Sequence, residues 1–402
     1  MRKSLFAIAL TGLIGISLLS GCKNKGVSKE IVEEQNIVAD KKAEALLDEY
    51  QQYNQQHMTE LDIDVQKYLD TMNKLFPSEG NICYSPVSLN TALENYTYLI
   101  KDGEPKDEII NFIGGIKYKD YIKAVNNYQE NCYYRIIDRI WANTQYDLIF
   151  KDSPAKNFVY YIDMSKKSSQ DIHNEFVDKY TNHFMTQTPE FQKSSTIEVM
   201  NIIYFQDKWL NDDVKMESYP FHNEDDTVTE TSMMKHNLGS CEYYKNDTCY
   251  AIPIKYLNTM STLYLIYYED DIETVDVSNL FDGHHKKSAS SIEVVFPEFE
   301  IDSKIDFDNE KLEKVGLAHI DECIPEYNSY NKDVQIAQEV KIQVNKEGTK
   351  AGAMSTIIPD LGFLLSEDTE KLYFVFDKPF YYMVSDINND ISFIGRLSNI
   401  NQ

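Results

Sequence analysis

The sequence predicts an α+β protein, built as one large domain with mixed or antiparallel β-sheets. Helical patterns come first, beginning with apolar residues at Val65, Leu69, Met72 and Leu75 that share one helix face. After residue 195, strand-like runs dominate, and many of them alternate polar and apolar residues. Helices first and strands later, without a regular strand–helix–strand rhythm, indicate the α+β class.

The elements follow in chain order. Pro77 and Gly80 end the first helix, a second helix begins near Pro86, helical patterns continue to about residue 130, and residues 171–187 form another helix. The predicted strands are 197–205, 249–254, 262–268, 292–296, 340–344, 372–376, 380–384 and 391–395. Neither an internal repeat nor a Pro/Gly/Ser-rich linker divides the chain, so we expect one domain over residues 61–402.

Composition excludes several functions. The chain has 402 residues and a formal charge of −26, so it lacks the basic surface that nucleic acids require. Only 15 glycines are present, and neither GxGxxG nor GxxxxGK[ST] occurs. No HExxH, GxSxG or Cys/His zinc spacing occurs either. We therefore expect no catalytic residues, no metal and no cofactor.

The N-terminus reads as a lipoprotein signal peptide over residues 1–22. Two basic residues precede an apolar run that is too short for a comfortable membrane span. The tetrad Leu19-Ser20-Gly21-Cys22 resembles a bacterial lipobox, in which Cys22 becomes the lipidated first residue; the alternative is an ordinary secretory signal. Residues 23–60 are polar, as expected of a tether. We therefore expect a lipoprotein on the extracytoplasmic face of a bacterial cell, anchored by acyl chains.

Five further cysteines remain, and an odd number leaves at least one free or paired between chains. Cys241 and Cys249 flank a predicted turn at Lys245-Asn246-Asp247. Two alternatives follow: a cross-strand disulfide, or buried thiols that pack as small hydrophobic groups. The five are Cys83, Cys132, Cys241, Cys249 and Cys323.

Residues 346–369 form a long stretch between two predicted strands, and loops of this length usually carry a function. Small residues occupy alternate positions at Thr349, Ala351, Ala353 and Ser355. In an extended chain these side chains share one face, so the segment has the pattern of a strand that can slide over a packed core. The second half contains an exposed apolar segment, Leu361-Gly362-Phe363-Leu364-Leu365, which suits recognition by a partner.

Several segments, taken in order, resemble the serpin family. Each motif alone is weak, but their order and spacing make the resemblance specific over about residues 61–400. The segments are Asn81-Ile82-Cys83-Tyr84-Ser85-Pro86-Val87-Ser88, Asn174-Glu175-Phe176-Val177 with Thr181, residues 200–209 ending in Trp209, residues 344–353, Phe376-Asp377-Lys378-Pro379-Phe380, and Phe393-Ile394-Gly395-Arg396.

The resemblance implies a protease inhibitor and not an enzyme. Serpins fold into a metastable form with three β-sheets, eight or nine helices and an exposed reactive-centre loop. A protease attacks the loop and forms an acyl-enzyme, and the cleaved loop then inserts into the central sheet and distorts the protease. The hinge of this loop maps to Glu347, Gly348, Thr349, Ala351, Gly352, Ala353 and Ser355.

The resemblance also places residues beneath the central sheet. Ser85, Ser88 and Asn201 map to the shutter, where strands must part. The family commonly has a histidine on the neighbouring strand, and the matching residue here is Gln338, which keeps hydrogen bonding but does not titrate. Trp209 maps to the breach, where the loop first enters.

The chain departs from the family at two charges near the hinge. The family's hinge usually carries Glu where this chain has Lys346, and the family's basic partner matches Glu298. We predict a charge-swapped ion pair between Glu298 and Lys346. The alternative is two unrelated exposed charges.

Two counts place the scissile bond. Counting forward from Gly348 gives Gly362–Phe363, whereas counting back from Pro379 gives a bond near Asp368. The number of residues between the hinge and the scissile bond sets the timing of loop insertion. We therefore favour the forward count and bracket the bond between Leu361 and Leu365. These residues suit elastase-, chymotrypsin- or subtilisin-like serine proteases, and papain-like cysteine proteases are also within reach. No Arg or Lys lies between Lys350 and Lys371, so a trypsin-like target is not expected.

Two other functions stay open. A non-inhibitory serpin would act as a cell-surface binding or scaffold protein, and the small hinge residues argue against it. A surface hydrolase or solute-binding lipoprotein would need convergent polar groups that the sequence does not display. The expected partners are therefore a target protease, in a covalent complex, and the membrane through lipid on Cys22. The chain itself is expected to be a monomer.

Overall fold

The computed structural model of the chain describes residues 36–39, 65–114, 127–129, 132–146, 158–188, 190–191, 195–320, 334–349, 370–386 and 390–400. Its elements, in order, are α2 (Val65–Leu75), β1 (Ile82–Tyr84), α3 (Pro86–Thr97), α4 (Glu104–Phe112), β2 (Asn127–Gln129), β3 (Cys132–Asn143), β4 (Val159–Ile162), α6 (Lys167–Tyr180), β5 (Ile197–Lys208), β6 (Lys215–His222), β7 (Val228–Lys245), β8 (Tyr250–Lys255), β9 (Thr262–Tyr267), η3 (Ile272–Thr274), β10 (Lys286–Pro297), β11 (Phe299–Asp306), α7 (Asn309–Lys314), β12 (Val334–Asn345), β13 (Gly348–Thr349), β14 (Lys371–Val375), β15 (Phe380–Ser385) and β16 (Ile391–Leu397).

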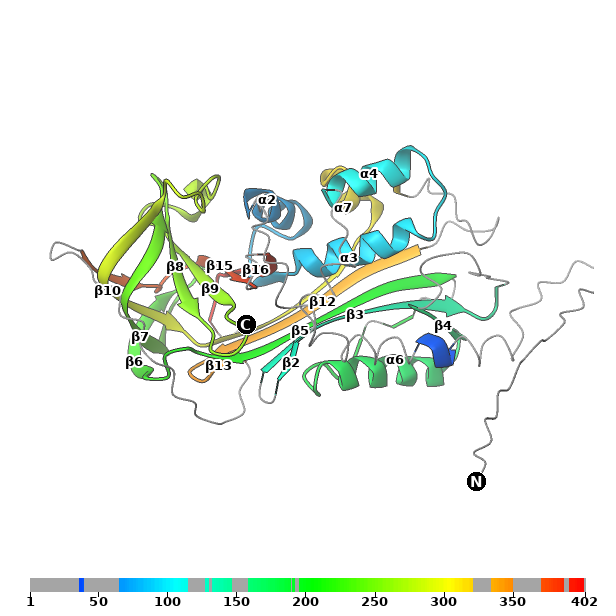
Figure 1. Cartoon of the computed structure of the whole chain (residues 1–402), viewed down its shortest axis with the longest axis horizontal. Helices are drawn as coiled ribbons and strands as arrows, with labels where there is room; N and C mark the ends of the chain where they lie inside the picture. The colour runs from blue at the N-terminus through cyan, green and yellow to red at the C-terminus, as the bar shows by residue number, and fades with distance from the viewer. Residues whose placement is uncertain are drawn as a thin grey trace, which may run out of the picture.

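A central sheet runs along the molecule. Its strands are ordered β11-β12-β13-β5-β3-β2, and β4 also pairs with β3. Figure 1 shows α3 on one face of this sheet and α6 on the other. β3 and β5 pair antiparallel from Tyr133↔Gln206 to Ala142↔Ile197, which gives the sheet a rigid middle. The slot described below lies on the other side of β5.

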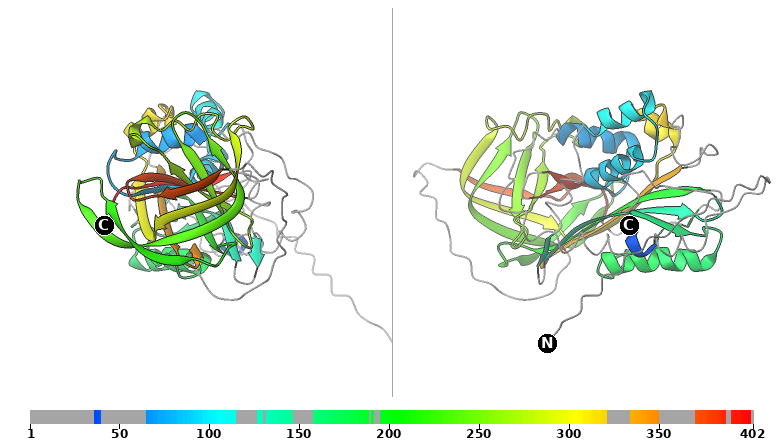
Figure 2. Two further views of the ribbon diagram at one scale, coloured as in Figure 1. Left: turned by 90° about the vertical axis from the view of Figure 1, so that its left-hand side faces the viewer. Right: turned by 45° about the vertical axis from the view of Figure 1, so that its right-hand side comes forward.

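The second sheet forms the rest of the molecule and confirms the α+β class. Its order is β1-β16-β15-β9-β8-β7-β10-β14, with β6 on β7, and the left view of Figure 2 looks onto its curved strands. The described residues thus form two hydrogen-bonded sheets, where the resemblance implies three. Within this sheet, the 18-residue β7 and the 12-residue β10 stay paired across a register shift between Ala289 and Ile292.

The first two predicted helices are confirmed. α2 buries Val65, Leu69 and Met72, as the helical spacing predicts. α3 begins at Pro86, and the Ser85 side chain accepts a hydrogen bond from the backbone N–H three residues on, which caps the helix.

The helical pattern expected up to about residue 130 is confirmed as far as α4, but it is wrong at residues 127–129, which form β2. The twelve-residue β3 follows, where no strand was predicted. β3 is buried on both faces, with Ile136, Ile137 and Trp141 among its inaccessible residues, so the two-residue alternation of a strand is lost. β6, β7 and β11 also lie outside the predicted strands. α6 ends at Tyr180, earlier than predicted, because Asn182 and His183 have left-handed backbone angles.

The disulfide alternative for Cys241 and Cys249 is wrong, because both are free thiols. β7 pairs Tyr244 with Ala251, so Cys249 lies opposite Asn246 and away from Cys241. Burial raises the pKa of both thiols to about 11, as expected of cysteines that pack as hydrophobic groups. Among the helices in the described ranges, none combines the length and apolar character needed to cross a bilayer.

Candidate functional site

The central sheet is open between β5 and β12. These strands run parallel, and within the described ranges their ladder joins only residues 334–336 to 197–199. At the other end of the gap, β13 lies between the two strands and pairs with both. Two small cavities of about 50 and 10 Å³ lie along the gap, each lined by residues of β5 and β12. The candidate site is therefore a slot in the sheet, already filled at one end by two residues of a third strand.

β13 fits the slot because its first residue is glycine. Gly348 has φ +134°, and a Cβ there would lie 2.2 Å from the carbonyl oxygen of Asp207 and 2.6 Å from Cα of Lys208. Thr349 is buried, and its hydroxyl lies 2.8 Å from the hydroxyl of Tyr256. Two of the predicted hinge residues, Gly348 and Thr349, therefore already belong to the sheet.

An aromatic cluster surrounds the point where β13 enters. The Trp209 indole N–H donates a hydrogen bond of 2.9 Å to the carbonyl of Asn345, and its ring stacks on Tyr256 with centroids 4.9 Å apart. His236 stacks on Phe296 and meets Trp209 edge-on. Burial lowers the pKa of His236 to about 4, so its ring is neutral at pH 7. Trp209 thus lies beside the turn that leads into β13.

Asp207 fixes a turn beside this cluster. Its carboxylate is fully buried and accepts hydrogen bonds from the backbone N–H groups of Asn258 and Thr259 and from both of their side chains. The turn follows Tyr256, so Asp207 holds the end of β5 and the partner of Thr349 in one arrangement.

The predicted ion pair between Glu298 and Lys346 is wrong in form. Glu298 Oε1 accepts a hydrogen bond of 2.9 Å from the backbone N–H of Lys346, whose ammonium lies 3.6 Å from Glu347 instead. The reason is register: Phe299 pairs with Val344, which places Glu298 beside the backbone of the β12–β13 turn. The two residues are in contact, but the contact does not use the lysine charge.

Ser85, Ser88, Asn201 and Gln338 come together beneath the slot. The Gln338 amide donates to the carbonyl of Ser85 at 2.8 Å and accepts from its N–H at 3.1 Å. The Ser88 hydroxyl donates to the carbonyl of Asn201 at 3.4 Å, and the Ser85 hydroxyl donates to the carbonyl of Ser392 at 2.7 Å. The start of α3 is therefore bonded to both strands that border the slot.

The opposite face of the slot, beneath α6, carries titratable groups. His173 Nε2 lies 3.3 Å from Glu198, and its Nδ1 lies 2.9 Å from the hydroxyl of Thr188. Burial, helped by the nearby Arg139 charge, lowers the pKa of His173 to about 3, so the ring is neutral at pH 7 and its contact with Glu198 is not an ion pair. Glu339 of β12 lines the same cavity, and burial raises its pKa.

The remaining predicted site residues lie outside the described residues. They are Cys22 of the lipobox, Ala351, Gly352, Ala353 and Ser355 of the hinge, and Leu361, Gly362, Phe363, Leu364 and Leu365 of the reactive segment.

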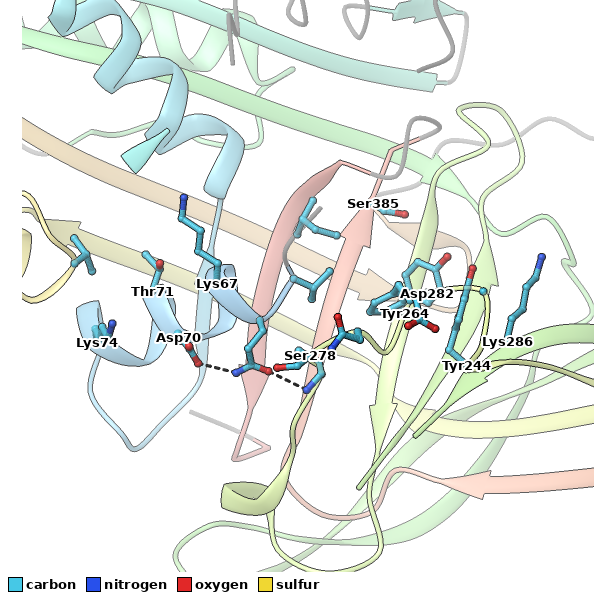
Figure 3. Close-up of a pocket in the computed structure, with 18 of the residues that line it drawn as sticks. Lys67, Asp70, Thr71, Lys74, Tyr244, Tyr264, Ser278, Asp282, Lys286 and Ser385 are labelled. Carbon is cyan, nitrogen blue, oxygen red and sulfur yellow. Dashed lines mark hydrogen bonds between the residues drawn. The ribbon is translucent and has the colours of Figure 1, made fainter. Parts of the chain in front are cut away.

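A larger hollow of about 1280 Å³ lies between α2 and the second sheet, away from β5 and β12. The Gln66 side chain links its two sides, donating to Asp70 at 2.7 Å and accepting from the backbone N–H of Val277 at 2.9 Å (Figure 3). Lys67, Asp282 and other polar residues line it as well. The hollow contains none of the residues that the resemblance assigns to inhibition.

Three residues at the entry point lie outside the predicted site: Asp207, His236 and Tyr256. Asp207 precedes Trp209 by two positions, so the motif around Trp209 could have indicated it. Nothing in the sequence near His236 or Tyr256 marks them, since tertiary packing alone brings β7 and the end of β8 to the slot.

The fold thus places the short strand β13 between β5 and β12 at one end of the central sheet. The family model of serpins, described as serine protease inhibitors, matches residues 57–400. The chain therefore belongs to the serpin family.

Relatives and solved structures agree with this assignment. Serine proteinase inhibitor 2 of rabbitpox virus (strain Utrecht) is 24% identical over 340 residues, covering 79% of this chain and 94% of the viral protein. The thermophilic serpin tengpin in its native state has a TM-score of 0.68 at 17% identity, covering 85% of this chain and 96% of tengpin. Thyroxine-binding globulin in complex with thyroxine has a TM-score of 0.65 at 16% identity, covering 92% and 100%. These structures share the fold with this chain.

Proposed function

We propose that this serpin is an irreversible, suicide-substrate inhibitor of proteases. The observation that supports the proposal most strongly is β13. The hinge enters the slot at Gly348–Thr349, and the chain continues into β14 at Lys371. A cut between these two strands frees the residues after Thr349 to continue along the slot.

The chemistry is that of an ordinary protease substrate. The catalytic hydroxyl or thiol of the protease attacks a carbonyl carbon between Leu361 and Leu365, and the peptide bond breaks. The new amino terminus takes the proton that the hydroxyl or thiol loses, and the hinge-side chain stays on the protease as an ester or thioester. Insertion of that chain before water hydrolyses the bond traps the covalent complex.

The register of β13 predicts where the inserted residues go. Thr349 pairs with Val344 and Asp207. If the antiparallel register continues, Ser355 lies between Gln338 and Asn201, the pair bonded to the start of α3. Residues 350–356 then fill the free length of the slot. Residue 357 is the first to meet the ladder of residues 334–336 and 197–199, which must open for insertion to finish.

The face that receives the small hinge residues is apolar and packed. On the side of Thr349, continued register places Ala351 beside Ile342 and Phe205, and the next small residue beside Val340 and Ile203. All four neighbours are buried. Side chains larger than alanine would have to displace them, since protein interiors are close-packed.

The proposed targets are elastase-, chymotrypsin- or subtilisin-like serine proteases, with papain-like cysteine proteases as a further class. We also propose that lipid on Cys22 holds the chain, as a monomer, on the extracytoplasmic face of a bacterial cell. The alternative is a non-inhibitory serpin that acts as a cell-surface binding or scaffold protein. That role needs no insertion, so it predicts no gain in heat resistance after cleavage of the loop.

The test mixes the chain from residue 23 with chymotrypsin, elastase or subtilisin. We expect an SDS-stable complex and a large rise in the melting temperature of loop-cleaved chain, and the mass of the released C-terminal peptide locates the bond. Thr349→Arg should abolish the complex while leaving cleavage intact. Ser232→Arg, which places the same side chain on an exposed position of β7, is the matched control. Complete cleavage by all three proteases, without complex or stabilisation, would contradict the proposal.

A further inference from the structure

Among the strands that the structure describes, β4 is an edge of the central sheet. It pairs with β3 in parallel from Ile140↔Val159 to Asn143↔Ile162. The carbonyl of Ile162 accepts a hydrogen bond from the N–H of Thr144, so Ile162 directs its backbone groups toward β3. Because successive residues of a strand alternate in this direction, Tyr161 directs its N–H and C=O away from the sheet.

Asn36 satisfies both of these outward groups with one side chain. Its Nδ2 donates to the carbonyl of Tyr161 at 3.0 Å, and its Oδ1 accepts from the N–H of Tyr161 at 2.6 Å. The amide thus supplies the donor and the acceptor that a further strand would supply. Ala39, in the same turn, is only 2% exposed, so the turn also packs against the protein.

The edge that Asn36 covers lacks its own protection. The sequence of β4 is Val-Tyr-Tyr-Ile, with neither a charge nor a proline. Exposed edge strands of this composition pair readily with other chains, and proteins commonly cover or charge them. The contact between Asn36 and Tyr161 therefore has a physical reason beyond the chance packing of an N-terminal extension.

The covered edge lies at the end of the sheet opposite the hinge. Tyr161 pairs with Ala142, which pairs with Ile197 at the start of β5. Thr349 pairs with Asp207 near the end of β5. Ten residues of β5 separate the two levels, about 33 Å at the usual strand rise. Figure 1 shows the dark-blue turn of residues 36–39 beside β4, and β13 at the far end of the central sheet, next to the second sheet.

We infer that residues 36–39 form a clip that attaches the N-terminal tether to the end of the sheet opposite the reactive-centre loop. The inference rests on the proposed lipid at Cys22. With the clip closed, 13 residues separate Cys22 from Asn36, and a chain of that length reaches at most about 45 Å. Without it, 42 residues separate Cys22 from Val65 at the start of α2, and the same relation gives at most about 145 Å.

The clip therefore changes the point of attachment as well as the length of the tether. A short tether that ends at β4 holds this end of the sheet toward the bilayer. The hinge end, and with it the entry to the slot, then faces away from the membrane, where a soluble protease approaches. A long tether that ends at α2 imposes no such orientation.

The first experiment tests the clip itself, by hydrogen exchange on the soluble chain from residue 23. Asn36→Ala removes both hydrogen bonds to Tyr161, so the Tyr161 amide should exchange about tenfold faster, as expected for the loss of one net hydrogen bond. Val38→Ala, at an exposed position of the same turn, should leave the exchange unchanged. Unchanged exchange in Asn36→Ala overturns the inference.

The second experiment tests orientation, with the full lipidated chain in phosphatidylcholine vesicles that contain an acceptor-labelled lipid. A genetically encoded amino acid that carries the donor dye replaces one residue in each of two labelled proteins. The first label replaces Ser168, which is exposed near the β4 end, and the second replaces Met260, which is exposed near the hinge end. We expect stronger energy transfer from position 168 than from position 260, and Asn36→Ala should remove at least half of the difference.

Equal transfer from the two positions in the unsubstituted chain, or an unmodified Cys22 in the purified lipoprotein, overturns the orienting role. Neither experiment contains a protease. A failure of the inhibition assay therefore leaves both results meaningful, and a failure of the clip leaves the inhibition assay meaningful.

Discussion

Substituting Gly348→Ala tests whether β13 prepares the slot for insertion. A Cβ at this position would lie 2.2 Å from the carbonyl oxygen of Asp207 and 2.6 Å from Cα of Lys208. Both are backbone atoms of β5, so neither can rotate away as a flexible side chain would. The φ of +134° adds strain for any residue with a Cβ. β13 must therefore leave the slot or push β5 aside.

The magnitude follows from what is lost. Backbone strain of about 1 kcal/mol and the Thr349–Tyr256 hydrogen bond, worth about 1 kcal/mol, sum to about 2 kcal/mol. If this cost falls on the first step of insertion, that step slows about 30-fold, because 1.36 kcal/mol corresponds to a factor of ten. Hydrolysis of the acyl-enzyme then overtakes insertion. We expect cleavage at the unsubstituted rate and a large fall in the trapped fraction.

The assay is a quenched-flow reaction with the protease that forms the SDS-stable complex, followed by gel quantification of complex and cleaved chain. Gly239→Ala is the control, since Gly239 also has a positive φ, +62°, but no atom lies within 4 Å of its added Cβ. The reasoning is refuted if Gly348→Ala traps the protease as efficiently as Gly239→Ala does.

Three further predictions follow from individual contacts. Gln338→Ala removes both hydrogen bonds to Ser85 and should lower the free energy of unfolding by about 1–3 kcal/mol in urea titrations, whereas Gln343→Ala, at a partly exposed position of the same strand, should change it little. Glu298→Ala should slow insertion because it removes the acceptor for the N–H of Lys346. Lys346→Met should leave the insertion rate unchanged, because the contact uses the backbone and not the lysine charge. If stopped-flow fluorescence shows equal slowing in both variants, the ion pair is supported instead. Burial, and then the neighbouring Asp386 charge, raises the pKa of Asp390 to about 7. The folded state therefore holds a proton that the unfolded state has lost, and the free energy of unfolding should fall by on the order of 2–4 kcal/mol as pH rises from 4 through 7. Asp390→Asn should flatten this dependence in denaturation measured across that pH range, and an unaltered slope would exclude the assignment.

Local patterns in the sequence were sufficient for elements that bury one face. α2 repeats apolar residues at helical spacing, and Ser85-Pro86 marks the start of α3. The same patterns fail for β3, because a strand buried on both faces has no polar side to mark its period. Its buried polar residues, such as Arg139, further obscure the strand pattern.

The site was predictable where a family motif carries the residue. The motifs place Ser85, Asn201 and Gln338 at one point, and the structure brings them together beneath the slot. No motif includes Tyr256 or His236, and they contact Trp209 only because of the tertiary packing of the second sheet. The Glu298–Lys346 contact shows a further limit, because a pair of opposite charges predicts proximity but not which atoms meet.

The two ends of the slot have opposite effects on the proposed insertion. β13 already occupies the hinge end, so the first added residue extends an existing strand and needs no new nucleus. Each residue from 350 to 356 then fills unoccupied length and gains neighbours on both β5 and β12. Only residues 357–359 must replace a ladder, the one between residues 334–336 and 197–199. The loop therefore gains ladder bonds over seven positions before it must break any between these strands. At about 0.5–1.5 kcal/mol for each net hydrogen bond, the early positions outweigh the late ones, so the proposed insertion should run to completion once it passes Ser355.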